Sequence, residues 1–329
     1  MATVGTGRRA RTRRGTAVRS LLALCLAAGL AAGCTVPGDP DDGRGPSQRS
    51  PGTSGREPGP AVLAVKIDNA RGARPHTGVE DADVVYVEQV EGGLSRLMAV
   101  YATRLPDRVG PVRSAREADL ELLRQFDRPV LAYSGAQSKL KPLIEAAPLT
   151  AVTPESFSGV YTRGAGRPAP HNLYLRPGRL MDRPAGAEAL TTGFRFGRAP
   201  SGGTPEVSRT VRYPAARFTF TWSAGDGRWL VSLDGSPALT SDGGRLAPAT
   251  VVVQYVTVRP SKFQDFLGNN TPYTETVGSG EALVLRGGKA YEARWNRPGA
   301  EDGTTFTTEE GERMNFARGQ VWVVYAKAP

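Results

Sequence analysis

Apolar residues gather in four runs in the first half of the chain, over residues 61–68, 83–90, 95–102 and 129–134. Each run is short, and Gly, Pro, Asn or Asp residues bound most of them. Apolar runs of this length between turn residues are typical of buried strands. We therefore predict four strands that supply the core of this half.

Two glycines, Gly92 and Gly93, separate the second run from the third and predict a two-residue hairpin turn. In that register Glu91 lies opposite Leu94, and Arg96 is the diagonal neighbour of Glu91 on one face. We expect a cross-strand ion pair between Arg96 and Glu91. Glu88 then points to the apolar face of the hairpin, where a carboxylate needs a partner or a raised pKa.

Helical periodicity begins after Ser114. The spacing of Ser114 and Glu117 fits a capping box, and apolar residues on one side predict a helix that continues to about Asp127. A second helix is expected over 137–147. Strands and helices that alternate in this way predict an α/β domain with a mixed sheet over residues 61–200.

The second half, residues 205–329, reads as short strands separated by turn residues such as Asp226-Gly227 and Gly287-Gly288. Helical periodicity is scarce there, so we predict a smaller antiparallel β domain, either a sandwich or a partly open barrel. The four tryptophans are candidates for a sugar-stacking face, although tryptophans on strands more often belong to a core. The fold class is therefore an α/β domain followed by an antiparallel β domain.

The N-terminal segment 1–34 has the three parts of a secretory signal: an Arg-rich stretch, an apolar stretch too short to span a bilayer, and small residues before Cys34. The end of the segment resembles a bacterial lipobox, in which the cysteine becomes lipid-modified. A lipid on Cys34 would anchor the protein to the outer face of the cell membrane. Residues 35–60 are rich in Pro, Gly and Ser and predict a flexible tether. Sec and twin-arginine export both remain open.

The formal net charge of +10 suggests a nucleic-acid partner at first sight. Six arginines of the signal segment account for most of the excess, since the rest of the chain has 36 basic and 32 acidic residues. No basic run or aromatic-basic module remains, so we expect no nucleic-acid binding. The only two cysteines, Cys25 and Cys34, lie in the signal segment.

Charged residues are dense between the predicted strands of the first half. Asp68 and Asn69 follow the first strand, where α/β proteins tend to place ligands. Turns to nearby backbone amides are the alternative role for both side chains. Arg74 follows in the same loop and is a candidate ligand-binding residue.

Two further arginines, Arg113 and Arg116, flank Ser114 at the predicted start of the first helix. Arginines beside free backbone N–H groups form a ready anion site. Pairing of both arginines with local acids is the alternative. The remaining candidate ligand-binding residues are Ser114 itself, His76, Arg96 and Asn172.

The chain has two histidines, His76 and His171, each of which follows a proline in a loop. Histidine is the natural acid–base group near neutral pH. We take His171, with Asp68 or Glu88 as its carboxylate partner, as the candidate catalytic set. No HxH or HExxH spacing is present, so neither a metal site nor a cofactor is expected.

Four segments carry a family resemblance: 67–78 (IDNARGARPHTG), 82–96 (ADVVYVEQVEGGLSR), 110–116 (GPVRSAR) and 169–174 (APHNLY). In this order they resemble the YerB-like bacterial lipoproteins, domain of unknown function 3048. The resemblance implies a lipoprotein signal, this α/β domain and a smaller C-terminal β domain. The family often has Gln at the position of His76, which favours His171 as the acid–base residue. No activity is implied.

Three functions remain open. A lipid-anchored binding module would capture an anionic envelope component, a phosphorylated or carboxylated glycan or peptide, through Arg113 and Arg116, with Arg74 as a further contact. An enzyme would hydrolyse or transfer part of such a polymer with His171. A scaffold for a membrane partner would use the charges for stability alone. The sequence leaves the oligomeric state undetermined.

Overall fold

One long mixed sheet organises the part of the chain that the computed structural model describes, residues 61–265 and 268–328. The predictions for the signal segment, for Cys34 and for the tether lie outside these residues. The strands of the sheet, in spatial order, are β18 (Thr305–Thr308), β17 (Lys289–Arg297), β16 (Gly278–Arg286), β13 (Thr250–Val256), β19 (Val321–Lys327), β2 (Val84–Gln89), β3 (Ser95–Tyr101), β1 (Leu63–Asp68), β4 (Val130–Ala132) and β5 (Thr150–Val152), and β8 (Thr204–Pro205) pairs with β17.

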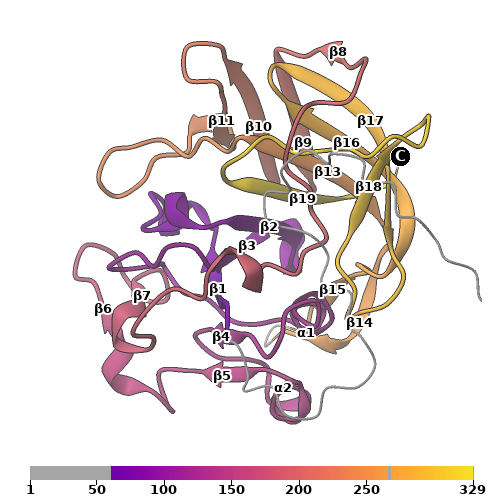
Figure 1. The fold of residues 1–329 in the computed structure, drawn as a ribbon. Helices are drawn as coiled ribbons and strands as arrows, with labels where there is room; N and C mark the ends of the chain where they lie inside the picture. Colours follow the sequence, from indigo (N-terminus) through magenta and orange to yellow (C-terminus); the bar gives the residue numbers. More distant parts are fainter. Residues whose placement is uncertain (1–60, 266–267, 329) are drawn as a thin grey trace, which may run out of the picture. The chain divides into compact units, whose positions relative to one another are not determined.

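Strands from both halves of the chain share this sheet. β19 runs parallel to both of its neighbours, with Val321 opposite Thr250 of β13 on one side and opposite Val84 of β2 on the other. Figure 1 shows yellow β19 beside indigo β2, although more than two hundred residues separate them. The division into domains at about residue 200 stays a prediction.

Smaller antiparallel sheets accompany the large one. They contain β9 (Ser208–Tyr213), β10 (Ala216–Ser223), β11 (Arg228–Leu233) and β12 (Ser236–Pro237), then β14 (Val258–Gln264) with β15 (Asn270–Thr274), and β6 (Tyr161–Arg163) with β7 (Leu173–Leu175). The sequence-based fold class is confirmed in its coarser form, a large mixed sheet with antiparallel sheets. Strands prevail over helices more than we predicted.

Both faces of the large sheet are covered by apolar side chains. On one face the inner residues of β10 and β11, such as Phe218 and Trp229, pack against Val65 and Val251 of the large sheet. On the other face Leu122 of the first helix and Phe316 pack in a second core. Trp229, Trp295 and Trp322 are buried, so the core interpretation of these tryptophans is confirmed.

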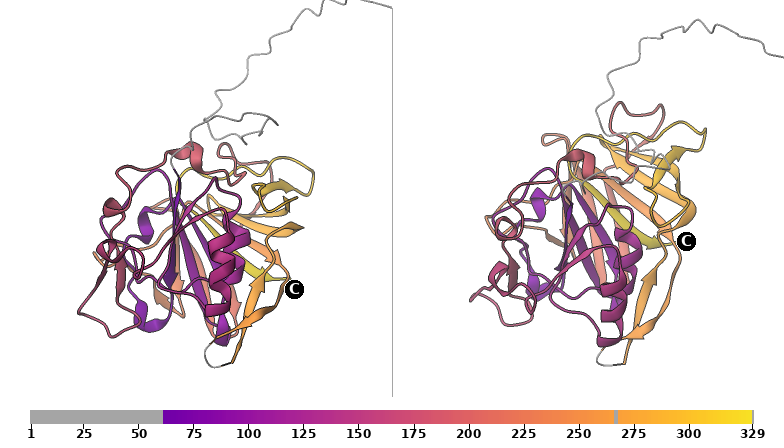
Figure 2. Two further views of the ribbon diagram at one scale, coloured as in Figure 1. Left: turned by 90° about the horizontal axis from the view of Figure 1, so that it is seen from below. Right: turned by 60° about the horizontal axis from the view of Figure 1, so that its bottom comes forward.

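The helices are short. They are α1 (Glu117–Leu123) and α2 (Lys141–Ala146), with 3-10 turns η1 (Arg71–Ala73), η2 (Val79–Asp81), η3 (Glu91–Gly93), η4 (Ser138–Leu140), η5 (Ser158–Val160), η6 (Pro177–Arg179) and η7 (Ala187–Ala189). Figure 2 shows the helical segments beside the indigo strands. None of the helices described between residues 61 and 328 has the length and apolar character that a membrane span requires.

The predicted hairpin register is wrong by one residue. Arg96 lies opposite Glu88, and Gln89 lies opposite Ser95. The cause is η3, which replaces the two-residue turn and lets the Val90 N–H bond to the Leu94 carbonyl at 2.8 Å. Because successive side chains of a strand alternate between faces, moving β3 by one residue against β2 changes which side chains share a face. Glu88 and Arg96 are directly opposite each other and therefore lie on the same face.

The predicted capping box is also wrong. α1 begins after Arg116, whose backbone N–H donates to Asp119 Oδ2 at 2.6 Å, and the helix ends at Leu123 rather than Asp127. Ser114 is not the cap because the helix begins at Glu117, with the extended residue Arg116 in the cap position. The neighbouring Arg113 N–H bonds to the Lys66 carbonyl at 2.8 Å.

Candidate functional site

The carboxyl end of β1 places Asp68 at the centre of a charged cluster. The Asp68 side chain is buried, with 5% of its surface exposed. Its Oδ1 accepts the Ala70 N–H at 3.1 Å, as the turn alternative requires. Its Oδ2 lies 3.2 Å from Arg113 Nε and 2.8 Å from His171 Nδ1. One carboxylate therefore orients both a guanidinium and an imidazole.

His171 comes from the loop before β7. Its ring packs on Gly72, where a Cβ would lie 3.3 Å from His171 Cδ2, so this position favours glycine. Since the Asp68 carboxylate accepts a hydrogen bond, Nδ1 carries the proton in the neutral ring and Nε2 keeps its lone pair. A quarter of the His171 side chain is exposed. The pair has the geometry of an oriented general base.

The loop that carries His171 is fastened to the loop that follows Asp68. Arg167 donates to the Ala73 carbonyl at 2.6 Å and to the Pro75 carbonyl at 2.8 Å. Asn172 fixes its own loop, because it donates to the Gly164 and Arg167 carbonyls at 3.1 Å and 3.0 Å. Asn172 is therefore engaged within the protein.

Arg96 is the exceptional cation of the cluster. On β3 it lies opposite Asp68 of β1 and Glu88 of β2, yet the one side-chain hydrogen bond of Arg96 among the described residues goes to the Ser114 carbonyl, at 3.1 Å. Burial lowers the pKa of Arg96 to about 9, and the positive charges of Arg116 and Arg113 act in the same direction, whereas the negative charges of Glu91 and Asp68 oppose them. Within residues 61–265 and 268–328 no carboxylate forms an ion pair with Arg96.

Arg116 is already occupied. Its Nε lies 2.7 Å from Glu91 Oε1, and its Nη2 donates to Glu91 Oε2 at 2.7 Å. Thr271 of β15 completes the contact by donating to Glu91 at 2.6 Å. Burial acts to raise the pKa of Glu91, but the hydrogen bonds and charge of Arg116 outweigh burial, so the pKa is lowered. The expected Arg96–Glu91 pair is thus replaced by Arg116–Glu91.

Glu88 does not meet His171. Its carboxylate contacts the Lys66 ammonium, which also donates to Asp119 at 2.6 Å. Lys66 and Asp119 are fully buried. Glu88 therefore belongs to a buried ion triad with Lys66 and Asp119, and Asp68 alone partners His171.

Asn69 and Arg74 support the loop after β1. Asn69 Nδ2 donates to Ser95 Oγ at 2.9 Å, and Arg74 donates to the Asn69 carbonyl at 2.7 Å. Arg74 also pairs with Asp234 at 2.9 Å. Both side chains are thus held by partners from other elements.

His76 is fully buried beside the same cluster. Its Nε2 lies 3.0 Å from the Asp68 carbonyl oxygen and must carry the proton, since a carbonyl only accepts. Burial lowers the pKa of His76 to about 4. The ring is therefore neutral near pH 7 and holds the end of β1 in place.

The sequence interpretation missed the role of Lys66. A lysine in the middle of the apolar run 61–68 was the available signal, because a buried ammonium needs carboxylate partners. Asp234 gave no signal, since its contact with Arg74 joins residues 160 positions apart. Among the described residues, no group of three or more His, Cys, Asp or Glu side chains is arranged to hold a metal ion.

Comparison with known proteins gives the family. Residues 51–190 match the model of the N-terminal domain of DUF3048, a protein of unknown function, and residues 209–323 match the model of the DUF3048 C-terminal domain. The chain belongs to the DUF3048 family. The resemblance to this family predicted from the sequence is confirmed.

A Bacillus subtilis (strain 168) relative bears the name "Putative lipoprotein YerB". It is 33% identical over 279 residues, which cover 79% of this chain and 80% of YerB. The crystal structure of YerB from Bacillus subtilis matches this fold with a TM-score of 0.67 at 20% identity, over 84% of this chain and 94% of the other. That structural likeness concerns the fold alone.

Proposed function

We propose that this DUF3048 protein is a lipoprotein that binds an anionic cell-envelope component, a phosphorylated or carboxylated glycan or peptide, with Arg96 and Arg113. Lipid on Cys34 would hold it at the outer face of the cell membrane. The lipobox-like segment before Cys34 and the name of the relative YerB support this location.

The observation that carries the proposal is the buried guanidinium of Arg96. Burying a cation costs free energy unless an anion compensates it. The carboxylates opposite Arg96 on β1 and β2 are engaged by other cations: Asp68 by Arg113, and Glu88 by Lys66. An anion from a ligand would supply the missing partner.

Arg113 is a second cation close to Arg96. It uses Nε for Asp68, while 27% of its side chain is exposed and its two terminal amino groups form no hydrogen bond among the described residues. A carboxylate or phosphate suits such a planar pair of donors. This proposal moves the anion from the start of α1, where Arg116 is occupied, to Arg96 and Arg113.

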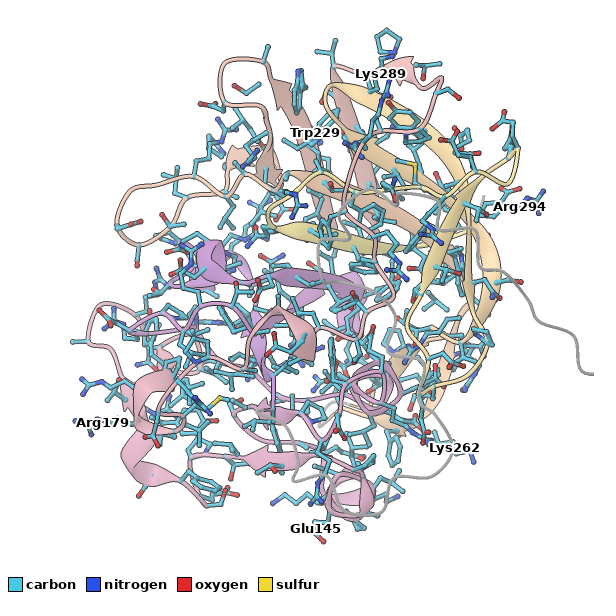
Figure 3. All side chains as sticks on the ribbon, in the orientation of Figure 1. Glu145, Arg179, Trp229, Lys262, Lys289 and Arg294 are labelled. Carbon is cyan, nitrogen blue, oxygen red and sulfur yellow. The ribbon has the colours of Figure 1, made fainter. Side chains whose placement is uncertain are left out.

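A titration of the full-length protein with glucuronate and glucose 6-phosphate tests this, with glucose as the neutral control. We expect calorimetry to detect the binding of both anions to the wild-type protein. Arg113→Gln should lower the affinity for each anion by roughly tenfold or more. Arg179→Gln is the matched control, because Arg179 is exposed and projects away from the ribbon (Figure 3). Equal affinities in wild type and Arg113→Gln would refute the proposal. Arg96→Gln is compared only after its thermal unfolding shows a folded protein.

The Asp68–His171 contact favours a second candidate function, hydrolysis or group transfer on an envelope polymer. His171 would act as the general base, Asp68 would orient it, and Arg113 would hold the anion of the substrate. This second function requires the same anion site and, in addition, a general base at His171.

Purified peptidoglycan sacculi provide the probe for this second function. We expect wild-type full-length protein to release new reducing ends or free amines, and His171→Gln to lower the rate by about 10²–10⁴-fold. Arg179→Gln should keep the wild-type rate. If wild type and His171→Gln release reducing ends and amines at the same rate, the Asp68–His171 pair has no catalytic role on this polymer.

A further inference from the structure

One edge of strand β9 is free. β9 is the last strand of the four-stranded sheet, and β10 pairs with its other edge (Figure 1). The Trp222 N–H donates to the Val207 carbonyl at 2.9 Å, and in an antiparallel pair bonded residues alternate with residues that are not bonded. The odd-numbered residues of β9 therefore bond to β10. The backbone N–H and C=O groups of the even-numbered residues point to the free edge, and these residues are Ser208, Thr210 and Arg212.

No backbone partner meets these edge groups within residues 61–265 and 268–328. Instead, a hollow of about 280 Å³ lies beside them. The consecutive residues 209–214 all line this hollow, although the side chains of a strand alternate between two faces. A hollow that contacts successive residues follows the edge of the strand, where their backbone groups are accessible. The edge is thus open to a further strand, which is one way in which sheets bind peptides.

The inner side of the hollow is apolar. Val211 and Tyr213 of β9 line it together with Val253 and Ala326 of the large sheet, and all four belong to one core. Val207 lies on the same face of the strand and is 75% exposed. A residue of an added strand points to the same face as the residue opposite it. Residues opposite Val211 and Tyr213 would therefore enter the hollow, which suits apolar side chains.

The outer face of β9 is positively charged. Arg212 lies directly opposite Arg217 of β10, an arrangement in which like charges repel. Neither arginine forms an ion pair with a carboxylate in the described part of the chain. Arg209 differs, because it faces inward and pairs with Glu206 at 2.5 Å. An acidic residue opposite Arg212 would relieve the repulsion on the outer face, whereas the inner face needs no added charge.

We propose that β9 binds an extended segment of a partner protein in which apolar and acidic residues alternate. The apolar side chains enter the hollow, and the acidic side chains lie beside Arg212 and Arg217. A second copy of β9 suits this edge less well, because it brings two further arginines and no acidic residue. The proposal is independent of the anion site described above, because the two have no residue in common.

A capped peptide of sequence Val-Glu-Val-Glu-Val, labelled at one end for fluorescence anisotropy, is the probe. Full-length protein in a neutral detergent should bind it, and lysine in place of both glutamates should weaken binding by roughly tenfold or more. Backbone N-methylation tests the pairing, because only alternate N–H groups of an added strand face β9. Methylation of one residue type, valine or glutamate, should abolish binding, and methylation of the other should leave binding nearly unchanged. Equal effects of the two methylated peptides would overturn the proposal.

Thr210→Pro removes one N–H of the free edge, and a proline is tolerated on an edge strand where its N–H would face solvent. Thr210→Val is the matched control, because both variants lose the hydroxyl contact with Thr219 at 3.0 Å. Once thermal unfolding shows both variants folded, Thr210→Pro should weaken the peptide by roughly tenfold or more, and Thr210→Val should bind as wild type does. Equal affinities of the two variants would contradict pairing at this edge.

Arg212→Gln tests the charge of the outer face. It should weaken the glutamate peptide but not the same peptide with glutamine in place of glutamate. Arg294→Gln, at an exposed residue of β17, is the matched control and should change neither affinity (Figure 3). Equal weakening in both variants would refute the role of Arg212. A wild-type dimer in light scattering that Thr210→Pro dissociates would assign the edge to a second copy and overturn the assignment of a partner.

Discussion

Replacement of Lys66 by methionine is expected to lower the free energy of unfolding by about 3–5 kcal/mol. The substitution removes the only cation of the buried triad and leaves the carboxylates of Glu88 and Asp119 facing each other without compensation. Burial lowers the pKa of Lys66 to about 8, and the charge of Asp119 opposes this effect, so the ammonium is still largely protonated at pH 7. Urea unfolding of the full-length protein at pH 7, followed by circular dichroism, measures the loss.

Two further variants make this experiment decisive. Lys262→Met changes an exposed lysine and should alter stability by less than about 0.5 kcal/mol. The triple variant Lys66→Met/Glu88→Gln/Asp119→Asn should recover part of the loss, because it leaves no buried charge uncompensated. If Lys66→Met stays within 1 kcal/mol of wild type, the triad does not support the fold in the way inferred from its burial.

The second large effect concerns pH and His76. The pKa of His76 in the folded protein is about 4, because the ring is buried, against an ordinary value of 6.5. Between these two values the unfolded chain binds a proton at this residue and the folded chain does not. Stability from His76 is therefore complete above about pH 6.5 and falls as the pH drops toward 4, by about 3 kcal/mol in total.

Glutamine at position 76 removes this titration. Its amide can donate to the Asp68 carbonyl as His76 Nε2 does, so His76→Gln is expected to fold. The difference in unfolding free energy between wild type and His76→Gln should be constant from pH 7.5 to 9 and should shrink or reverse on acidification to pH 4. Parallel stability curves over the whole range would contradict the assignment of a buried neutral ring.

The strands near Asp68 could be predicted from the sequence because each follows from a local run of apolar residues. β1, β2 and β3 arise from apolar runs, and of the two carboxylates predicted as partners of His171, Asp68 or Glu88, the structure brings Asp68 into contact with it. The register of β2 and β3 was missed because the glycines form η3 instead of a two-residue turn. Both have positive φ, and a Cβ on Gly93 would lie 2.5 Å from Pro214 Cβ. That constraint comes from a residue more than a hundred positions away.

The partners of the arginines were the least predictable part. Whether Arg113 or Arg116 is available for a ligand depends on which carboxylate reaches it, and Glu91 reaches Arg116 only because η3 and the start of α1 meet in the fold. The helix start was misplaced for a related reason: the residues around Ser114 bond to Lys66 and Gly135 instead of entering the helix. Such contacts depend on tertiary structure, and no local spacing encodes them.

The position of β19 has a consequence for biogenesis. Because this strand lies between β13 and β2 and is synthesised after both, the two sides of the large sheet stay apart until residues 321–327 arrive. The pairing of β19 with β2 joins residues more than two hundred positions apart in the sequence, which makes it slow to form. The two parts of the sheet would accordingly form separately during synthesis, and the sheet would close only when its last strand is complete.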